Sequence, residues 1–281
     1  MPRLHLFEIL DQSWCPRPVR DGATDFLEAI TGASDVYRSV RADFLAAMLA
    51  CRANQIVDLC SGGGGPWLSK PWQAVLEQQP GLRVLLTDKF PSRELCAKLG
   101  RGAAVSAVSI PVDAGDVPAA LNGPNRPNGT DAGRDLRGFR TLFSSFHHFS
   151  DDAAIRILAD AVRNRHGMAS AEVTLRRPRA LFVMCLMPLF VWALTPRIRP
   201  FRWSRLLLTY LLPVIPFVVC FDGIVSCLRA RTPEELLALT HRFPEYIWKA
   251  GYGEGRWLPP VYLIGVPRAN TRVEPEFDRA E

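Results

Sequence analysis

Short apolar runs alternate with helical patterns along most of the chain. Five runs are rich in β-forming residues and predict strands buried in a parallel sheet. Two further runs are separated by a glycine-rich turn and predict an antiparallel pair near the end of the chain. The five parallel strands are expected at 53–60, 81–90, 104–118, 139–150 and 169–175, and the pair at 244–251 and 260–267.

Helices are indicated before and between these runs. In 35–54, Tyr37, Val40, Phe44 and Met48 recur at steps of three and four residues and form one apolar face. Ser150, followed by two aspartates, is typical of a helix N-terminus. The sequence Thr-Pro-Glu-Glu at 232–235 predicts a capped helix start as well. Strands alternating with helices favour an α/β protein with helices on both faces of the sheet.

Two longer apolar runs stand outside this alternation. Residues 181–194 are 14 apolar positions broken by Pro188, and 206–221 are 16 positions broken by Pro213 and Pro216. A membrane-spanning helix needs about 20 apolar residues, and proline disfavours straight helices, so neither run is expected to span a membrane. Three interpretations remain: an inserted subdomain whose apolar faces bury one another, a hydrophobic lid over a substrate pocket, or a wedge at a membrane surface.

Positive charge gathers in the same region. The chain carries a net charge of +6, yet no acidic residue lies between Glu172 and Asp222. Seven arginines fall in that interval, so the rest of the chain sums to about −1. The interval is apolar and rich in proline, which argues against nucleic acid as a partner. It is compatible with peripheral membrane contact through 176–221. The arginines are Arg176, Arg177, Arg179, Arg197, Arg199, Arg202 and Arg205.

The cysteines indicate the cellular setting and predict no metal site. There are seven, scattered through 281 residues, with no CxxC or Cys/His pairing at metal-site spacing. Free thiols fit a reducing cytoplasm, and the first ten residues lack the apolar core of a signal peptide. We expect a cytoplasmic protein that is peripheral to the membrane if the basic, apolar interval contacts lipid.

A glycine-rich stretch, DLCSGGGGP at 58–66, connects the first predicted strand to a helix. It lacks the GK[ST] ending of a phosphate-binding loop. Asp58 at the strand end would repel a pyrophosphate but suits a cationic ligand. S-adenosylmethionine (SAM) carries both an ammonium and a sulfonium group, and glycine lets a backbone turn lie close to such a ligand.

The stretch IVDLCSGGGG resembles the first motif of class I SAM-dependent methyltransferases, with Asp58, Cys60, Gly62 and Gly64 at the motif positions. Cys60 stands where the family usually has glycine, which narrows the room for the methionine part of SAM. The resemblance covers roughly 35–175 and 230–267. It implies a Rossmann-like, mostly parallel seven-stranded sheet that ends in an antiparallel hairpin.

The resemblance also implies a set of SAM contacts. Asp88, 24 positions after Gly64, would hold the ribose diol. Asp113 would accept from the adenine amino group, with Ala114 beside it. The alternatives are that Asp88 caps a turn and that Asp113 makes an Asx turn before Gly115. The full cofactor set is Asp58, Cys60, Ser61, Gly62, Gly64, Asp88, Asp113, Ala114 and Ser144.

Candidate catalytic residues follow the fourth and fifth strands. His147 and His148 are the best general bases, since histidine titrates near neutrality. Glu172 is a second candidate base or an anchor for an amine. Phe146 and Trp14 would contact the sulfonium through cation–π attraction, and Trp14 or Arg20 would face the substrate. The alternative for each is ordinary packing or surface charge.

Four segments summarise the expected organisation. Residues 1–50 form a helical cap, 51–175 a SAM-binding Rossmann-like core, 176–230 a hydrophobic helical insertion or lid, and 231–281 a helix and strand pair that complete the core.

The leading functional hypothesis is a methyltransferase for a small or lipid-like hydrophobic molecule in a natural-product pathway. A second is a SAM cyclase that forms azetidine-2-carboxylate and releases methylthioadenosine. A third is a membrane-associated binding protein without catalysis.

Overall fold

The computed structural model describes residues 1–99, 103–117, 135–199, 201–255 and 258–268. The loop expected at 121–135 lies almost wholly outside the described residues. Within them, seven strands form one sheet in the order β3-β2-β1-β4-β5-β7-β6. The strands are β1 (Gln55–Asp58), β2 (Arg83–Leu86), β3 (Val105–Ala107), β4 (Phe139–Phe143), β5 (Met168–Glu172), β6 (Tyr246–Tyr252) and β7 (Val261–Pro267).

The sheet is parallel from β3 to β5, and β7 runs antiparallel to both β5 and β6. The predicted fold class is therefore confirmed, including the hairpin at the end. The strands are shorter than predicted, because the predicted runs also included loop residues beyond each strand end. All residues of β4, β5 and β7 are buried, as expected of strands covered on both faces.

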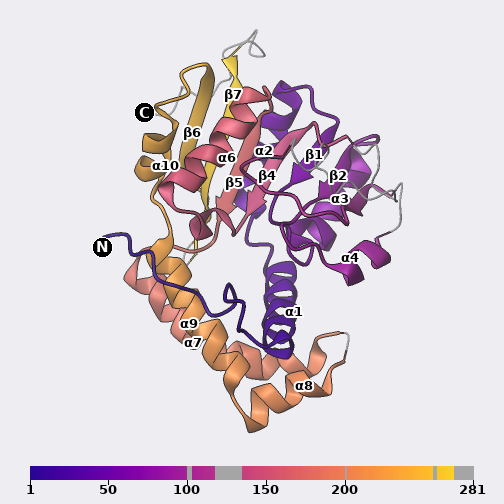
Figure 1. Cartoon of the computed structure of the whole chain (residues 1–281), viewed down its shortest axis with the longest axis vertical. Helices are drawn as coiled ribbons and strands as arrows, with labels where there is room; N and C mark the ends of the chain where they lie inside the picture. The colour runs from indigo at the N-terminus through magenta and orange to yellow at the C-terminus, as the bar shows by residue number, and fades with distance from the viewer. Residues whose placement is uncertain (100–102, 118–134, 200, 256–257, 269–281) are drawn as a thin grey trace.

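Helices cover both faces of the sheet (Figure 1). On one face, α6 (Asp151–Arg163) and α10 (Pro233–Thr240) share a core with Val57, Leu142 and Leu263. On the other, α2 (Arg38–Ala50) and α3 (Lys70–Gln78) share a core with Ile56, Phe139 and Ile264. Consecutive residues of a strand thus enter opposite cores, which is the period of two that a strand imposes.

The interval from β5 to α10 forms a helical arm that extends away from the sheet (Figure 1). Its helices α7 and α9 lie side by side, and α8 lies near the far end. The first helix, α1, packs on this arm through Ala23 and Phe26, whereas α2 packs on the sheet. The arm consists of α7 (Pro178–Leu194), η3 (Thr195–Arg197), α8 (Trp203–Leu206), η4 (Leu207–Leu211) and α9 (Val214–Arg229).

The helix that contains the first apolar run is longer than the run itself. The helix begins at Pro178, continues through Pro188 and runs to Arg197, so its 20 residues are long and apolar enough to cross a membrane. The second apolar run is bent by 78° between Trp203–Leu211 and Val214–Arg229. Length and composition alone are weak evidence for a span. Only 22% of the apolar window of the first helix is buried, however, so it is not an ordinary core helix.

Candidate functional site

The glycine-rich loop leaves β1 and turns sharply before a short 3-10 helix, η1 (Gly65–Leu68). Cys60, Gly62, Gly64 and Gly65 all have positive φ, a conformation that costs glycine little but strains the cysteine side chain. A Cβ built on Gly62 would meet nothing within 4 Å, so this glycine faces open space. Burial raises the pKa of the Cys60 thiol, which keeps it neutral.

Asp58 lies beneath this loop and is only 1% exposed. Its carboxylate accepts from Thr141 Oγ1 at 2.6 Å and from Ser61 Oγ at 2.7 Å. Burial raises the pKa of Asp58 to about 6, although the two hydroxyl groups oppose the shift. The carboxylate therefore holds the loop in shape from below and does not face the open space where a cationic ligand was expected to meet it.

Asp88 lies two residues beyond β2 and is partly exposed. The backbone N–H of Gly62 donates to Asp88 Oδ2 at 2.9 Å, and that of Phe90 donates to Oδ1 at 2.8 Å. Asp88 thus joins the second strand end to the glycine-rich loop. Because a carboxylate offers about four acceptor positions, it keeps capacity for the two hydroxyl groups of a ribose.

Asp113 makes the Asx turn that was the alternative interpretation. Its Oδ1 accepts from the N–H of Gly115 at 2.9 Å, and Lys89 Nζ lies 3.2 Å from Oδ2. The hydrogen bond from Gly115, opposed by partial burial and supported by Lys89, holds the pKa of Asp113 below its ordinary value. Ala114 is buried in the core of the α6 face.

Glu28 of α1 (Arg17–Ser34) was not among the predicted site residues. A Cβ on Gly63 would overlap Glu28 Oε1, so the carboxylate occupies the space that only glycine leaves free. Glu28 is exposed overall, yet burial of its carboxylate end, helped by nearby Asp25, raises its pKa to about 7. No local sequence pattern indicates this contact, because α1 reaches the loop only through tertiary packing.

The stretch after β4 brings three predicted residues to the same edge of the sheet. Ser144 has a positive φ, and its hydroxyl lies 2.7 Å from the hydroxyl of Tyr37. His147 Nδ1 lies 2.5 Å from Glu172 Oε2 at the end of β5. The N–H of Phe146 donates to the other oxygen of Glu172 at 2.6 Å. Ser144, His147 and Glu172 were predicted to lie on one rim of the sheet, and the structure brings His147 and Glu172 into contact.

The His147–Glu172 pair has a defined polarity. Burial raises the pKa of Glu172, but the charge and hydrogen bond of His147 outweigh this and hold it below its ordinary value. An ionised carboxylate only accepts hydrogen bonds, so Nδ1 of His147 carries the hydrogen. The opposite atom, Nε2, is buried and has no hydrogen-bond partner in the part of the chain that the structure describes. It is directed toward Glu8, whose Oε1 lies 3.8 Å away.

Phe146 was expected to contact the sulfonium, but its side chain does not face the site. Its ring is 1% exposed and belongs to the core on the α6 face. The guanidinium carbon of Arg231 lies over the Phe146 ring, 5.3 Å from the ring centroid, so Arg231 already makes the cation–π contact that this ring offers. The backbone and the side chain of Phe146 therefore differ in role: the backbone N–H supports Glu172, while the side chain fills the core.

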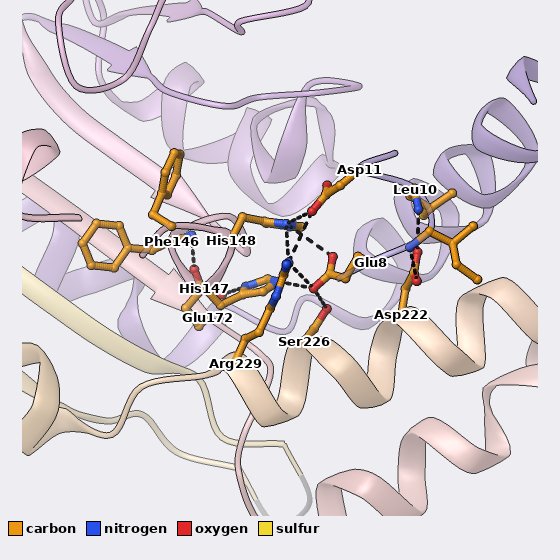
Figure 2. Close-up of polar contacts among 12 residues, drawn as sticks. Glu8, Leu10, Asp11, Phe146, His147, His148, Glu172, Asp222, Ser226 and Arg229 are labelled. Carbon is orange, nitrogen blue, oxygen red and sulfur yellow. Dashed lines mark hydrogen bonds and ion pairs between the residues drawn. The ribbon is translucent and has the colours of Figure 1, made fainter. Parts of the chain in front are cut away.

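An N-terminal segment lies over the histidine pair (Figure 2). Glu8, from this segment, is 3% exposed and accepts from Ser226 Oγ at 3.0 Å. Arg229 Nη1 of α9 lies 3.0 Å from Glu8 Oε1, and His148 Nδ1 lies 3.1 Å from Asp11 Oδ2. Burial lowers the pKa of His148, but Asp11 and Glu8 outweigh it and raise the pKa above its ordinary value.

Among the described residues, one group of ligand-type atoms is close enough to hold a metal ion. Atoms of Glu8, His147 and His148 lie within 4.8 Å of one another. No metal site was expected, because Glu8 is far from the histidines in sequence. Arg229 already supplies a cation to Glu8 and lies 3.5 Å from His148 Nδ1, so we assign no metal to this group.

The two predicted substrate residues near the N-terminus have different surroundings. Trp14 is exposed to solvent. Arg20 donates to the carbonyl oxygens of Leu10 at 3.1 Å and Gln12 at 2.7 Å. Its guanidinium therefore fixes the backbone of the N-terminal segment.

Comparison with known proteins gives matches among solved structures only. No protein-family model matches the chain, and no curated protein does. A structure of PigF with SAH has a TM-score of 0.47 at 17% identity, covering 91% of this chain. The chain spans 62% of the length of that structure.

Two further structures match with similar TM-scores. The methyltransferase domain of a bacterial CtHen1 has a TM-score of 0.44 at 9% identity, covering 82% of this chain and 99% of that one. The apo form of the SAM-dependent methyltransferase SibL has a TM-score of 0.43 at 13% identity. The match covers 91% of this chain and 71% of that one. The strand order of this chain, with β7 antiparallel, is nevertheless the Rossmann-like fold that its resemblance to class I SAM-dependent methyltransferases implied.

Proposed function

We propose that this protein is a SAM-dependent methyltransferase whose acceptor is a small or lipid-like hydrophobic molecule. The observation that carries the proposal is the buried Nε2 of His147. It has no hydrogen-bond partner among the described residues, and Glu172 orients the ring at the same sheet edge as the glycine-rich loop. Ligands of open α/β sheets bind at the carboxyl ends of the strands.

The residues around the loop suit SAM. Gly62 faces open space, Asp88 keeps acceptor capacity for a ribose diol, and the Glu28 carboxylate lies over Gly63 as an acceptor for an ammonium group. When bound there, SAM supplies the methyl group. Asp58, which is 1% exposed and accepts from Ser61 and Thr141, would contribute by holding the glycine-rich loop in shape.

His147 would act as the general base. As the acceptor's oxygen or nitrogen is methylated, its proton passes to Nε2, and Glu172 stabilises the resulting imidazolium. The carboxylate also keeps the ring in one tautomer. Because His147 is buried and Glu8 lies over Nε2, the acceptor reaches it only when the N-terminal segment shifts.

The neighbouring arm favours a hydrophobic acceptor. Helix α9 contacts the turn that carries His147, and its other end continues into the apolar surface of the arm. An acceptor with apolar groups would be held in surroundings that exclude water, which strengthens the electrostatic contribution of the His147–Glu172 pair.

The test is product analysis by mass spectrometry. The purified protein is incubated with SAM alone and with SAM plus a lipid and small-molecule extract. We expect S-adenosylhomocysteine only when the extract is present. Methylthioadenosine formed from SAM alone would replace this proposal with the cyclase, and absence of SAM binding in calorimetry would replace it with a binding protein.

A variant tests the base directly. His147→Gln is expected to slow S-adenosylhomocysteine formation by roughly 100-fold or more, with the dissociation constant for SAM changed less than about twofold. His241→Gln, at an exposed position, is the matched control and should behave like the parent protein. A His147→Gln variant with unchanged turnover would remove His147 from the mechanism.

A further inference from the structure

The arm presents an extended apolar surface to solvent. We define the arm surface as the exposed side chains of residues 178–217. Many of its large members are well exposed, including Trp203 at 78%, Leu211 at 72% and Phe217 at 61%. In Figure 1 this surface belongs to the part of the molecule that extends furthest from the sheet. Soluble monomers rarely expose contiguous apolar patches of this kind unless something binds there.

Internal packing accounts for only one side of the arm. Val191, Ile215 and Val219 form a small core with α1. Near this core, Arg205 is buried and pairs with Asp25 of α1. The apolar faces of α7 and α9 therefore do not simply bury one another, as the first of the three interpretations required.

The arginines of the interval divide into two groups. Arg176 pairs with Glu235, Arg177 stacks on Tyr252, and Arg202 and Arg205 pair with acids of α1. The remaining three, Arg179, Arg197 and Arg199, are exposed and pair with no acidic residue among the described parts of the chain. Arg197 and Arg199 lie beside the exposed aromatic residues of the arm surface in sequence.

Aromatic residues with a polar group add to this pattern. Trp192 Nε1 donates to the carbonyl of Thr209 at 3.1 Å, and the hydroxyl of Tyr210 donates to the carbonyl of Trp192 at 2.6 Å. Both side chains are exposed and link α7 to the segment after α8. Tryptophan and tyrosine are enriched where a protein meets the headgroup layer of a membrane, and arginine binds anionic lipid headgroups.

We propose that the arm surface docks on a bilayer that contains anionic lipids and lies in its interface. The apolar side chains would enter the boundary between headgroups and acyl chains, and Arg197 and Arg199 would contact lipid phosphates. Spanning is disfavoured because the Arg205–Asp25 pair and Asp222 lie on the other side of the arm and would enter hydrocarbon. The docking stands whether or not the proposed methyl transfer is correct, since it requires no substrate.

The first test is co-sedimentation of the full chain with phosphatidylcholine vesicles and with vesicles that also contain phosphatidylglycerol. We expect binding to the anionic vesicles and little to the neutral ones. The double variant Arg197→Glu/Arg199→Glu should bind anionic vesicles roughly 30-fold more weakly. Trp203→Ser/Leu211→Ser should weaken binding by a similar factor. Phe90→Ser removes an 83%-exposed aromatic residue outside the arm and is the matched control, with unchanged binding.

A second measurement guards against misfolded variants. In the parent protein, brominated lipid should quench part of the tryptophan fluorescence, and Trp203→Phe should remove most of that part. The proposal is overturned if the protein binds both kinds of vesicle equally, or if the variants sediment like the parent protein. It is also overturned if alkaline carbonate fails to release the protein from the vesicles, because that result indicates a membrane-spanning helix. The proposal would also be overturned if the protein formed a dimer whether or not vesicles were present and Leu211→Ser dissociated that dimer. Such a result would show that a second copy covers the arm surface.

Discussion

Two carboxylates from different elements flank the glycine-rich loop, and their surroundings differ. Asp88 accepts from two backbone N–H groups, whereas no backbone group donates to Glu28 among the described contacts. At this scale the same functional group has two backbone donors in one place and, in the other, a burial that raises its pKa to about 7. The consequences of that difference can be measured.

Asp88→Ala is expected to raise the dissociation constant for SAM about 30-fold or more, since a hydrogen bond to a charged group contributes about 1.5–3 kcal/mol. Isothermal titration calorimetry measures the change. Asp116→Ala, at an exposed aspartate, should leave the affinity unchanged. If Asp88→Ala binds SAM normally, the carboxylate only braces the loop.

The raised pKa of Glu28 predicts that SAM binding is coupled to proton release. Its pKa is raised to about 7 in the free protein, so at pH 6 it is mostly protonated. A cation beside it favours the carboxylate, and binding at pH 6 should release close to one proton, falling toward none well above pH 7. Calorimetry in buffers of different ionisation enthalpy measures this. Glu28→Gln should abolish the release, and Glu77→Gln on α3 should not.

The same shift affects folding of the free protein. Because folding raises the pKa of Glu28 from 4.5 toward 7, the folded state binds this proton more tightly than the unfolded chain. The free energy of unfolding therefore falls as pH rises through this interval. Glu28→Gln should flatten that dependence.

Among the elements, α10 shows how closely local sequence can determine structure. Thr232 Oγ1 accepts from the N–H of Glu235, and Glu235 Oε2 accepts from the N–H of Thr232 at 2.9 Å. This reciprocal capping box was expected from the sequence. Arg176, which pairs with Glu235 at 2.5 Å, connects the helix to the arm and was not expected.

Removing the cap should lower stability by a modest amount. We expect Thr232→Ala to reduce the free energy of unfolding by about 1 kcal/mol, as measured by urea denaturation. Thr232→Ser retains the hydroxyl and should keep most of the stability. Equal stability of the alanine variant would show that Glu235 and its arginine hold the helix start without the threonine.

In the whole molecule, the N-terminal segment joins parts of the chain that are far apart in sequence. The N–H groups of Ile9 and Leu10 donate to Asp222 of α9 at 2.7 and 2.9 Å. Through Glu8 the same segment reaches the histidine turn after β4 (Figure 2). The arm, the segment and the sheet edge thus meet at the proposed base.

Asp222→Ala should release this segment. We expect the amide hydrogens of Ile9 and Leu10 to exchange at least tenfold faster, because each loses its acceptor, as resolved by hydrogen exchange. Asp152→Ala, on the exposed start of α6, is the control. Unchanged exchange would mean that packing alone holds the segment over His147.

Sequence alone determined the α/β class, the approximate position of all seven strands and the helix starts at Ser150 and Thr232. These depend on local hydrophobic periodicity and on capping groups a few residues apart, so the information is contiguous in the chain. It also placed His147 and Glu172 at strand ends, because parallel strands bring their carboxyl ends to one edge.

Only the tertiary structure decided what these residues contact. The burial of Asp58 and Phe146, the approach of Glu28 to Gly63 and the cover of Glu8 over His147 all depend on segments packed from distant positions. The exposure of the arm is of the same kind: the apolar run is evident in the sequence, but whether it faces a core or solvent depends on how much surface its neighbours can bury.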